Sequence, residues 1–161
     1  MLFFDTNILV YTVDGIDPRR QSIAKALVAQ AMGANHFVIS TQVLQEFYSV
    51  MLRRRLLDLE AALSVMRLWV EHDTVNTTPD LLQRAFRLQQ RHRLSFWDSL
   101  IVQGAIESAC TTLYSEDLHH GMRFGALEIV NPFATPNAVH EAAKPYAVKR
   151  RASARPRAAP D

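Results

Sequence analysis

The sequence predicts an α/β fold in which a parallel sheet carries helices on both faces. Short apolar runs alternate along the chain with longer segments whose apolar residues recur at helical spacing, a pattern typical of strands separated by helices. The chain has 161 residues, which is enough for one domain with a substantial core. Its hydrophobic content of 48% and charged content of 21% are close to the globular average.

The N-terminal part contains two predicted strands with a helix between them. Residues 1–4 form a short apolar run that ends in Asp-Thr-Asn, a turn signal, and therefore predict a buried strand. A helix opens at Asp17-Pro18, because proline suits the first helical position, and it ends near Gly33. Residues 36–40 form the second strand.

The middle of the chain is predicted to be mostly helical. Ser40 or Thr41 caps a helix with an apolar stripe that extends to Met51. Asp58 starts a further helix, a short strand covers residues 74–76, and the next helix covers residues 78–92.

The C-terminal part of the domain contains one more helix and two strands. Ser95 and Asp98 have the spacing of a capping box and open a helix that extends to Cys110. Strands follow at residues 111–115 and 127–130. We therefore expect one domain over residues 1–135, followed over residues 136–161 by a basic tail rich in Ala, Pro and Arg that is largely disordered.

The net charge of +2 is unevenly distributed along the chain. Residues 142–161 contain six Lys and Arg side chains and one Asp, so the rest of the chain has a net charge of −3. An acidic body is unusual for a nucleic-acid-binding protein unless its acids hold metal ions. The basic tail is equally compatible with weak phosphate binding and with a solubilising extension.

Cysteine content and apolar runs exclude several classes of protein. The single cysteine, Cys110, excludes an internal disulfide framework and a multi-cysteine zinc site, and we interpret it as a small buried hydrophobe. No apolar run reaches the roughly 18–20 residues that span a bilayer, and the N-terminus has no basic region typical of a signal peptide. We therefore expect a cytoplasmic protein without a membrane segment.

Four acids are predicted to meet at one edge of the sheet. Asp5 ends the first strand, Glu46 lies early in the helix after the second strand, and Asp117 follows the fourth. Asp98 lies on the first turn of the helix before that strand, and such a helix begins at the carboxyl edge of a parallel sheet, where sites form. Crowded carboxylates repel one another, and hard cations such as Mg²⁺ or Mn²⁺ remove this repulsion and can activate water beside a phosphodiester.

Each of these acids also has an ordinary structural interpretation. Asp98 can be a favourable residue at a helix N-terminus, Asp5 a turn residue, Glu46 a solvated helix residue and Asp117 a cap. Taken singly, the two interpretations are equally good, but four placements on one predicted edge favour a shared site.

The residues around these acids resemble the motifs of the PIN-domain family. Residues 4–11, Phe-Asp-Thr-Asn-Ile-Leu-Val-Tyr, resemble its first strand and turn, and Gln45-Glu46-Phe47 resembles its second acidic motif. Residues 95–101, Ser-Phe-Trp-Asp-Ser-Leu-Ile, and residues 113–118, Leu-Tyr-Ser-Glu-Asp-Leu, resemble the third and fourth. The resemblance covers about residues 1–133 and is specific because all four motifs occur in order.

This resemblance implies a three-layer α/β/α sandwich with about five parallel strands and an Mg²⁺- or Mn²⁺-dependent site. Asp5 and Asp98 would be the principal metal ligands, Asp117 would complete the site, and Glu46 would hold a second ion or a water. Three further side chains would orient these carboxylates: Thr6, Asn7 and Ser115. Glu116 is the alternative to Asp117 as the inward acid.

The resemblance also implies an activity and partners. A VapC-type toxin would be a metal-dependent ribonuclease that hydrolyses RNA, forms a homodimer and is inhibited by a cognate antitoxin protein whose basic side chain enters the acidic cleft. Two alternatives are a non-catalytic RNA- or protein-binding module and, less favoured, a phosphoacceptor receiver, which would need a lysine beside its acids.

Other residues with chemical potential are interpreted conservatively. Arg53, Arg54 and Arg55 either contact RNA phosphates or provide favourable charge at a helix C-terminus. His119-His120 is interpreted as a polar loop. The aromatic residues Phe96, Trp97 and Trp69 are interpreted as core or interface residues and not as base-stacking surfaces.

Overall fold

The computed structural model describes residues 1–134, so the predicted tail at residues 136–161 lies outside the described part. The strands are β1 (Leu2–Phe4), β2 (Phe37–Ser40), β3 (Asp73–Val75), β4 (Thr112–Tyr114), β5 (Arg123–Phe124) and β6 (Leu127–Val130). The helices are α1 (Thr6–Val13), α2 (Pro18–Gly33), α3 (Thr41–Arg54), α4 (Leu59–Val70), α5 (Pro79–His92) and α6 (Phe96–Glu107).

These strands form a single sheet in the order β3-β2-β1-β4-β6-β5. Five strands are parallel, as predicted, and β5 pairs antiparallel with β6. The sequence did not predict β5 because a two-residue strand has too few positions to show alternation. Gly125, with φ of +63°, lies in the tight turn that joins β5 to β6.

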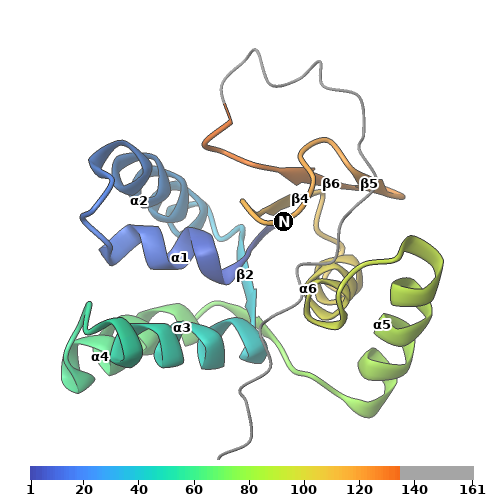
Figure 1. The fold of residues 1–161 in the computed structure, drawn as a ribbon, viewed down its shortest axis with the longest axis horizontal. Coiled ribbons are helices and arrows are strands. Elements are labelled where there is room, and N and C mark those ends of the chain that lie inside the picture. Colours follow the sequence, from blue (N-terminus) through green and yellow to red (C-terminus); the bar gives the residue numbers. More distant parts are fainter. Residues whose placement is uncertain (135–161) are drawn as a thin grey trace, which may run out of the picture.

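Helices cover both faces of the sheet, which confirms the predicted three-layer α/β architecture. In Figure 1, α1 to α4 lie on one side of the strands and α5 and α6 on the other. Helices α2 and α3 contact β2 from the first side, whereas α6 contacts β2 and β4 from the second. This arrangement follows from the strand order, because β1 to β3 extend the sheet in one direction and the α5–α6 connection returns the chain to β4 beside β1.

Polar side chains cap the helices where the sequence predicted. The Asp17 side chain accepts from the Arg20 N–H, with Pro18 in the first turn of α2. Ser40 accepts from the Val43 N–H at 3.3 Å, and Ser95 accepts from the Asp98 N–H at 3.0 Å. Each bond satisfies a backbone donor that the first helical turn leaves without a partner.

Helix α1 differs from expectation, because the Asp-Thr-Asn segment was predicted to form a turn. The helix begins immediately after the strand, and the Asp5 side chain accepts from the Thr6 N–H at its N-cap. Turn-forming and cap-forming residue types overlap, so the local signal did not distinguish them. The following apolar residues decide the outcome, since Ile8, Leu9 and Val10 are buried against the core.

The core lies on both faces of β1 and its neighbours. Its largest fully buried side chains include Phe3, Phe4, Phe37, Phe47, Ile39 and Leu113. Phe4 stacks on Phe37 with ring centroids 5.0 Å apart, and Trp69 packs edge-on against Phe47. Cys110 is also buried, as expected. Among the helices of residues 1–134, none is both long and apolar enough to cross a bilayer.

Candidate active site

The carboxyl ends of β1 and β4 bring the first and fourth motifs together. The two strands are parallel neighbours, with Phe4 in register with Tyr114. The Asp5 N–H continues the ladder by donating to the Tyr114 carbonyl at 3.0 Å. Asp5 and Ser115 therefore leave the sheet side by side, although they are 110 positions apart in the sequence.

Asp5 is a buried carboxylate held by three neutral donors. Its Oδ1 accepts from the Thr6 N–H at 2.7 Å, and its Oδ2 accepts from the Ser115 hydroxyl at 2.7 Å and the Asn7 amide at 3.0 Å. The pKa of Asp5 is nevertheless raised to about 7, mainly by burial and to a smaller extent by the nearby carboxylates of Glu46 and Asp117. Loss of hydration and like charge therefore outweigh the hydrogen bonds, which favour the ionised form.

Two side chains of α1 connect Asp5 to the other acids. The Thr6 hydroxyl donates to Glu46 Oε2 at 3.2 Å. The Asn7 amide, already near Asp5, also lies 3.3 Å from Asp117 Oδ2, and the Asn7 side-chain oxygen accepts from the Glu116 N–H at 3.2 Å. The first turn of α1 thus positions carboxylates from α3 and from the loop after β4.

Glu46 is held from its own helix as well. Gln42, four residues earlier on α3, donates to Glu46 Oε1 at 3.1 Å, and its amide nitrogen also lies 3.5 Å from the Trp97 carbonyl at the start of α6. Gln42 was not among the predicted site residues. Its i,i+4 spacing from Glu46 was the available signal, because such residues are neighbours on one helix face.

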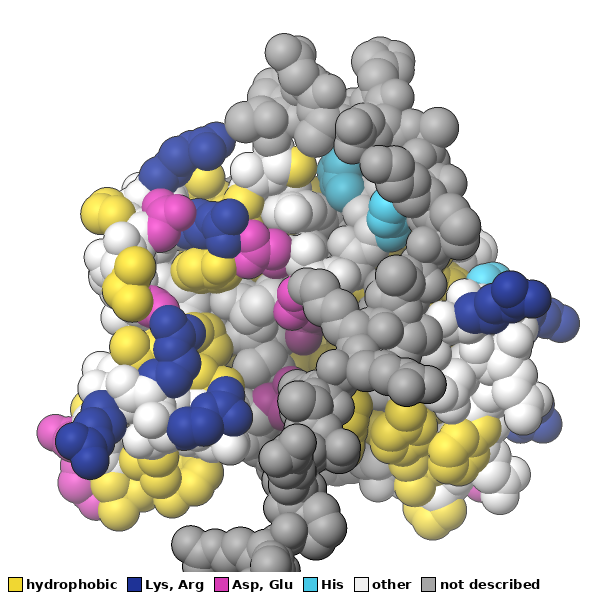
Figure 2. Space-filling model, viewed as in Figure 1, with side chains coloured by type: hydrophobic (Ala, Val, Ile, Leu, Met, Phe, Trp, Pro, Cys, Tyr) yellow, Lys and Arg dark blue, Asp and Glu magenta, His cyan; other side chains and the backbone are white. Residues whose placement is uncertain are grey.

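These residues surround a pocket of about 360 Å³. It is lined by Asp5, Thr6, Asn7, Val10, Tyr11, Glu46, Val50, Arg53, Arg54, Glu116 and Asp117. In Figure 2, acidic side chains follow one another down the middle of the face shown, and Lys and Arg side chains lie to their left. The structure therefore brings three of the four predicted acids into one hollow.

Asp98 does not line this pocket. It lies half-buried on the first turn of α6, at the same edge of the sheet, and its N–H is capped by Ser95. Within residues 1–134, no three His, Cys, Asp or Glu side chains are grouped closely enough to hold a metal ion. Asp5, Glu46 and Asp117 therefore line one pocket, and the convergence of Asp98 on the same site stays a prediction.

Glu116 and Asp117 have different partners although they are adjacent. Glu116 forms an ion pair with Arg20 and accepts from the Tyr11 hydroxyl at 2.7 Å. Asp117 instead shares the Asn7 amide with Asp5. The sequence analysis assigned no role to Tyr11 or Arg20, and nothing in the spacing of α2 indicates that Arg20 reaches the loop after β4.

The three consecutive arginines at the end of α3 have different positions. Arg53 and Arg54 line the pocket, and Arg54 also pairs with the buried Asp14 at 2.8 Å. Arg55 is the C-cap of α3 in a left-handed conformation, with φ of +53°, and does not line the pocket.

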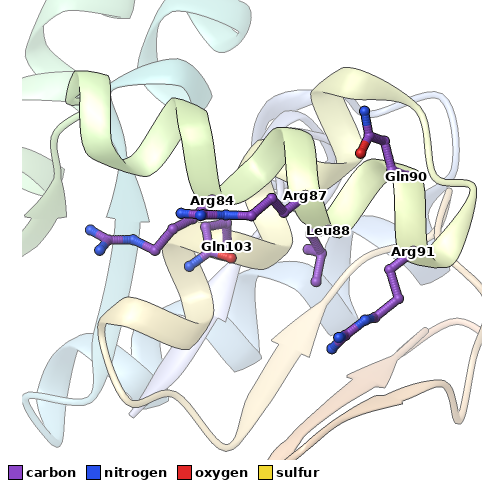
Figure 3. A pocket seen from close by; sticks show the side chains of 6 residues that line it. All are labelled: Arg84, Arg87, Leu88, Gln90, Arg91 and Gln103. Atoms are coloured by element: carbon purple, nitrogen blue, oxygen red, sulfur yellow. The ribbon is translucent and has the colours of Figure 1, made fainter.

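A larger hollow, of about 660 Å³, lies between α5 and α6. Figure 3 shows its lining, which consists of Arg84, Arg87, Leu88, Gln90, Arg91 and Gln103. Arg84 pairs with Glu107 at 2.7 Å. Because arginine and glutamine side chains dominate its walls and no carboxylate lines it, this hollow does not suit a cation.

Comparison with known proteins supports the fold. No curated protein matches the sequence. Among solved structures, the chain is similar to VapC20 of Mycobacterium tuberculosis, described as a toxin that cleaves the Sarcin-Ricin loop, with 24% identity, TM-score 0.59, and coverage of 71% of this chain and 88% of that one. It is also similar to a chain of a toxin–antitoxin complex from Klebsiella pneumoniae, with 20% identity and a TM-score of 0.63. That match covers 84% of this chain and 100% of the other. A third similar structure is VapBC2 of Rickettsia felis bound to a DNA fragment from its promoter, with 18% identity, TM-score 0.59, and coverage of 80% and 97%.

At these identities the structures support the fold alone. The PIN domain family model, however, matches residues 2–121, which is most of the chain and includes all four acidic motifs. The chain therefore belongs to the PIN domain family.

Proposed function

We propose that this protein is a metal-dependent ribonuclease that acts as the toxin of a toxin–antitoxin pair. The observation that carries the proposal is the pocket in which the buried Asp5 meets Glu46 and Asp117. PIN domains are typically nucleases, and the similar solved structures are toxins or toxin–antitoxin complexes.

The chemistry of the donors fits a hard divalent cation, although no three of the acids of residues 1–134 are grouped closely enough here to hold one. The pocket offers carboxylate oxygens, which Mg²⁺ and Mn²⁺ prefer, and the raised pKa of Asp5 shows that its charge is poorly compensated by the protein. Asp5 and Asp117 would hold the ion, with Asp98 reaching it from the start of α6 and Glu46 holding a second ion or a water. A bound ion would supply charge compensation and a more acidic water beside the scissile phosphate.

The protein's own side chains would orient the reacting groups. Ser115 and Thr6 fix both oxygens of Asp5, so this carboxylate cannot rotate away from the pocket. Each carboxylate oxygen of Glu46 accepts one hydrogen bond, Oε2 from Thr6 and Oε1 from Gln42. A lone pair of Oε2 is therefore still available to orient a water molecule and to accept a proton from that water.

Arg53 and Arg54 give the pocket a positive rim. Both line it, and guanidinium groups match the geometry of phosphate oxygens. We assign them to the RNA backbone on either side of the scissile bond. Arg54 retains its pairing with Asp14, which holds it in place at the rim.

A toxin also needs a partner that blocks this pocket. We propose that the cognate antitoxin inserts a basic side chain among the acids, because the pocket has the charge that such a side chain requires. We also propose a homodimer, for which exposed apolar side chains of α4 are available, among them Leu68 and Val70.

The proposal is tested by following cleavage of a structured RNA by the purified protein. We expect cleavage with Mg²⁺ or Mn²⁺, none with EDTA, and a loss of at least 100-fold in Asp5→Asn and Asp98→Asn, in line with the loss of a ligand or of its orienting group. Asp80→Asn is the matched control, because Asp80 lies exposed on the first turn of α5, as Asp98 lies on α6, but away from the pocket.

The outcomes separate this function from the alternatives. Full activity of either Asp5→Asn or Asp98→Asn would refute the assignment, and binding of RNA that stays intact in every metal would favour a non-catalytic module. A receiver is not supported, because Lys25 is the only lysine among residues 1–134 and lies on α2, outside the pocket.

A further inference from the structure

A second groove lies next to the acid pocket and has a different chemistry. Its volume is about 510 Å³, within the range of roughly 300–1,000 Å³ typical of small-ligand pockets. It is lined by Thr41, Gln42, Gln45, Asn76, Thr77, Leu82, Phe96, Trp97 and Leu100. None of these side chains is charged, so the groove suits a neutral group and not a phosphate or a metal ion.

The groove and the acid pocket share one hydrogen-bonded wall. Gln42 lines the groove, and its amide donates to Glu46, which lines the acid pocket. The same amide reaches the carbonyl of Trp97, the residue directly before Asp98. A ligand in the groove is therefore adjacent to a phosphate held at the acids.

Trp97 is the main exposed apolar surface of this groove. Half of it is accessible, at 50%, although the rest of the aromatic cluster holds it in place. Phe96 packs edge-on against it with ring centroids 5.3 Å apart, and Phe96 in turn stacks on Phe86 at 5.3 Å. Trp97 was interpreted as a core or interface residue; its exposure excludes the core, whereas Trp69 is buried as expected. Figure 2 shows exposed hydrophobic side chains gathered over the region of α5 and α6, to the right of the acidic side chains.

The lining of the groove also includes hydrogen-bonding groups without charge. Gln45, Asn76 and Thr77 are exposed and line it, and together they offer amide and hydroxyl donors and acceptors. A flat aromatic ring beside neutral donors and acceptors is the arrangement with which proteins bind unpaired nucleobases, which stack on the ring and present their edges to the polar groups.

We propose that this groove binds an unpaired nucleobase of the RNA, next to the phosphate that is cleaved, with Trp97 as the stacking surface. The inference rests on the proposed function and restricts the class of RNA substrate, because it requires a single-stranded segment beside the scissile bond. A contact between two copies of the chain would use the same aromatic residues, and the experiment below distinguishes such a contact from the binding of a nucleobase.

The test measures binding in EDTA, so that no RNA is cleaved. The sequence contains two tryptophans, and Trp69→Phe leaves Trp97 as the only tryptophan fluorophore. We expect single-stranded RNA tetranucleotides to quench this fluorescence and a fully paired RNA duplex to leave it unchanged. If Trp69→Phe does not fold, the difference between the wild-type and Trp97→Ala spectra isolates the same signal.

Affinity is then measured by the anisotropy of a fluorescein-labelled tetranucleotide. Trp97→Ala should bind roughly 5- to 100-fold more weakly, as expected for the loss of one stacked base, and Trp97→Phe should recover part of the affinity. Phe86→Ala is the matched control, because Phe86 is equally exposed in the same aromatic cluster but does not line the groove. It should bind RNA like the wild type.

Two results would overturn the proposal. One is unchanged Trp97 fluorescence at saturating RNA. The other is unchanged RNA affinity of Trp97→Ala. A smaller mass by light scattering in both Trp97→Ala and Phe86→Ala would then assign the cluster to contacts between copies. Quenching by RNA that is never cleaved in Mg²⁺ or Mn²⁺ would refute the ribonuclease function and leave the nucleobase groove in place.

Discussion

Replacing Asp5 by asparagine should stabilise the metal-free protein at neutral and alkaline pH. The wild-type carboxyl is buried, and its pKa is raised from 3.8 to about 7. A raised pKa in the folded state means that the folded protein holds a proton that the unfolded chain has already released. Wild-type stability therefore falls as pH rises from about 4 to about 7 and changes little above that range.

The size of the effect follows from that difference in pKa. A shift of about three units corresponds to roughly 4 kcal/mol of destabilisation once the carboxyl is ionised in both states. Asparagine has no charge and so avoids this destabilisation, and it remains a good N-cap for α1. However, its side chain has one oxygen in place of two, so the Ser115 and Asn7 donors compete for fewer acceptor oxygens. That loss costs about 1–3 kcal/mol, so the net stabilisation at pH 8 should be about 1–3 kcal/mol.

Urea unfolding in EDTA at a series of pH values measures this difference. The advantage of Asp5→Asn should be present at pH 8, shrink as pH falls through 7, and disappear or reverse near pH 4. Added Mg²⁺ should stabilise the wild type more than the variant, since a bound ligand stabilises only the state that binds it. If Asp5→Asn is less stable than the wild type by the same amount at pH 5 and pH 8, the pKa of Asp5 is not raised in the folded protein.

Three further predictions concern neighbouring parts of the molecule. Ser115→Ala removes the 2.7 Å donor to Asp5, and we expect Mn²⁺ affinity measured by calorimetry to fall about 10- to 100-fold while the far-UV circular dichroism is unchanged. Burial raises the pKa of the Cys110 thiol to about 11, so little of the reactive thiolate is present at pH 8. Iodoacetamide should therefore modify the native protein far more slowly than the protein in 8 M urea, and equal rates would mean that the thiol is accessible. Gly104→Ala should raise the free energy of unfolding by about 0.5–1 kcal/mol, because an added Cβ meets Phe3 and Val75 at 3.6 and 3.8 Å, which is ordinary packing within α6, and a loss of stability on urea unfolding would contradict this.

Most of the secondary structure could be predicted because it depends on local signals. Five strands were predicted from short runs of apolar, β-branched or aromatic residues, and the helices from α2 onward began at polar caps such as Asp17, Ser40 and Ser95. Helix α1 was missed because Asp5-Thr6-Asn7 is an equally good turn, and only burial of the residues that follow selects the helix. The strand β5 depends on pairing with β6 and has no local pattern of its own.

The site was predicted as far as strand topology determines it. Parallel neighbours place their carboxyl ends together, so Asp5 and Asp117 could be expected to meet before any coordinates were known. Asp98 was placed at the correct edge, but its distance from the pocket depends on how far α6 is displaced from the sheet, which spacing does not reveal. The same applies to Arg20, whose contact with Glu116 depends on the packing of α2 against α1.

The distribution of charge partners separates two kinds of acid at this edge of the sheet. Within residues 1–134, Glu116 in the wall of the pocket pairs with Arg20, and Asp14, which is buried and does not line the pocket, pairs with Arg54. The donors around Asp5, Glu46 and Asp117 are neutral instead: the backbone of Thr6 and the side chains of Thr6, Asn7, Gln42 and Ser115. Neutral donors orient carboxylates without cancelling their charge, so the pocket stays negative toward a cation from outside. In the proposed function, Arg53 and Arg54 at the edge of the pocket would keep that negative charge local and allow an anionic RNA backbone to approach.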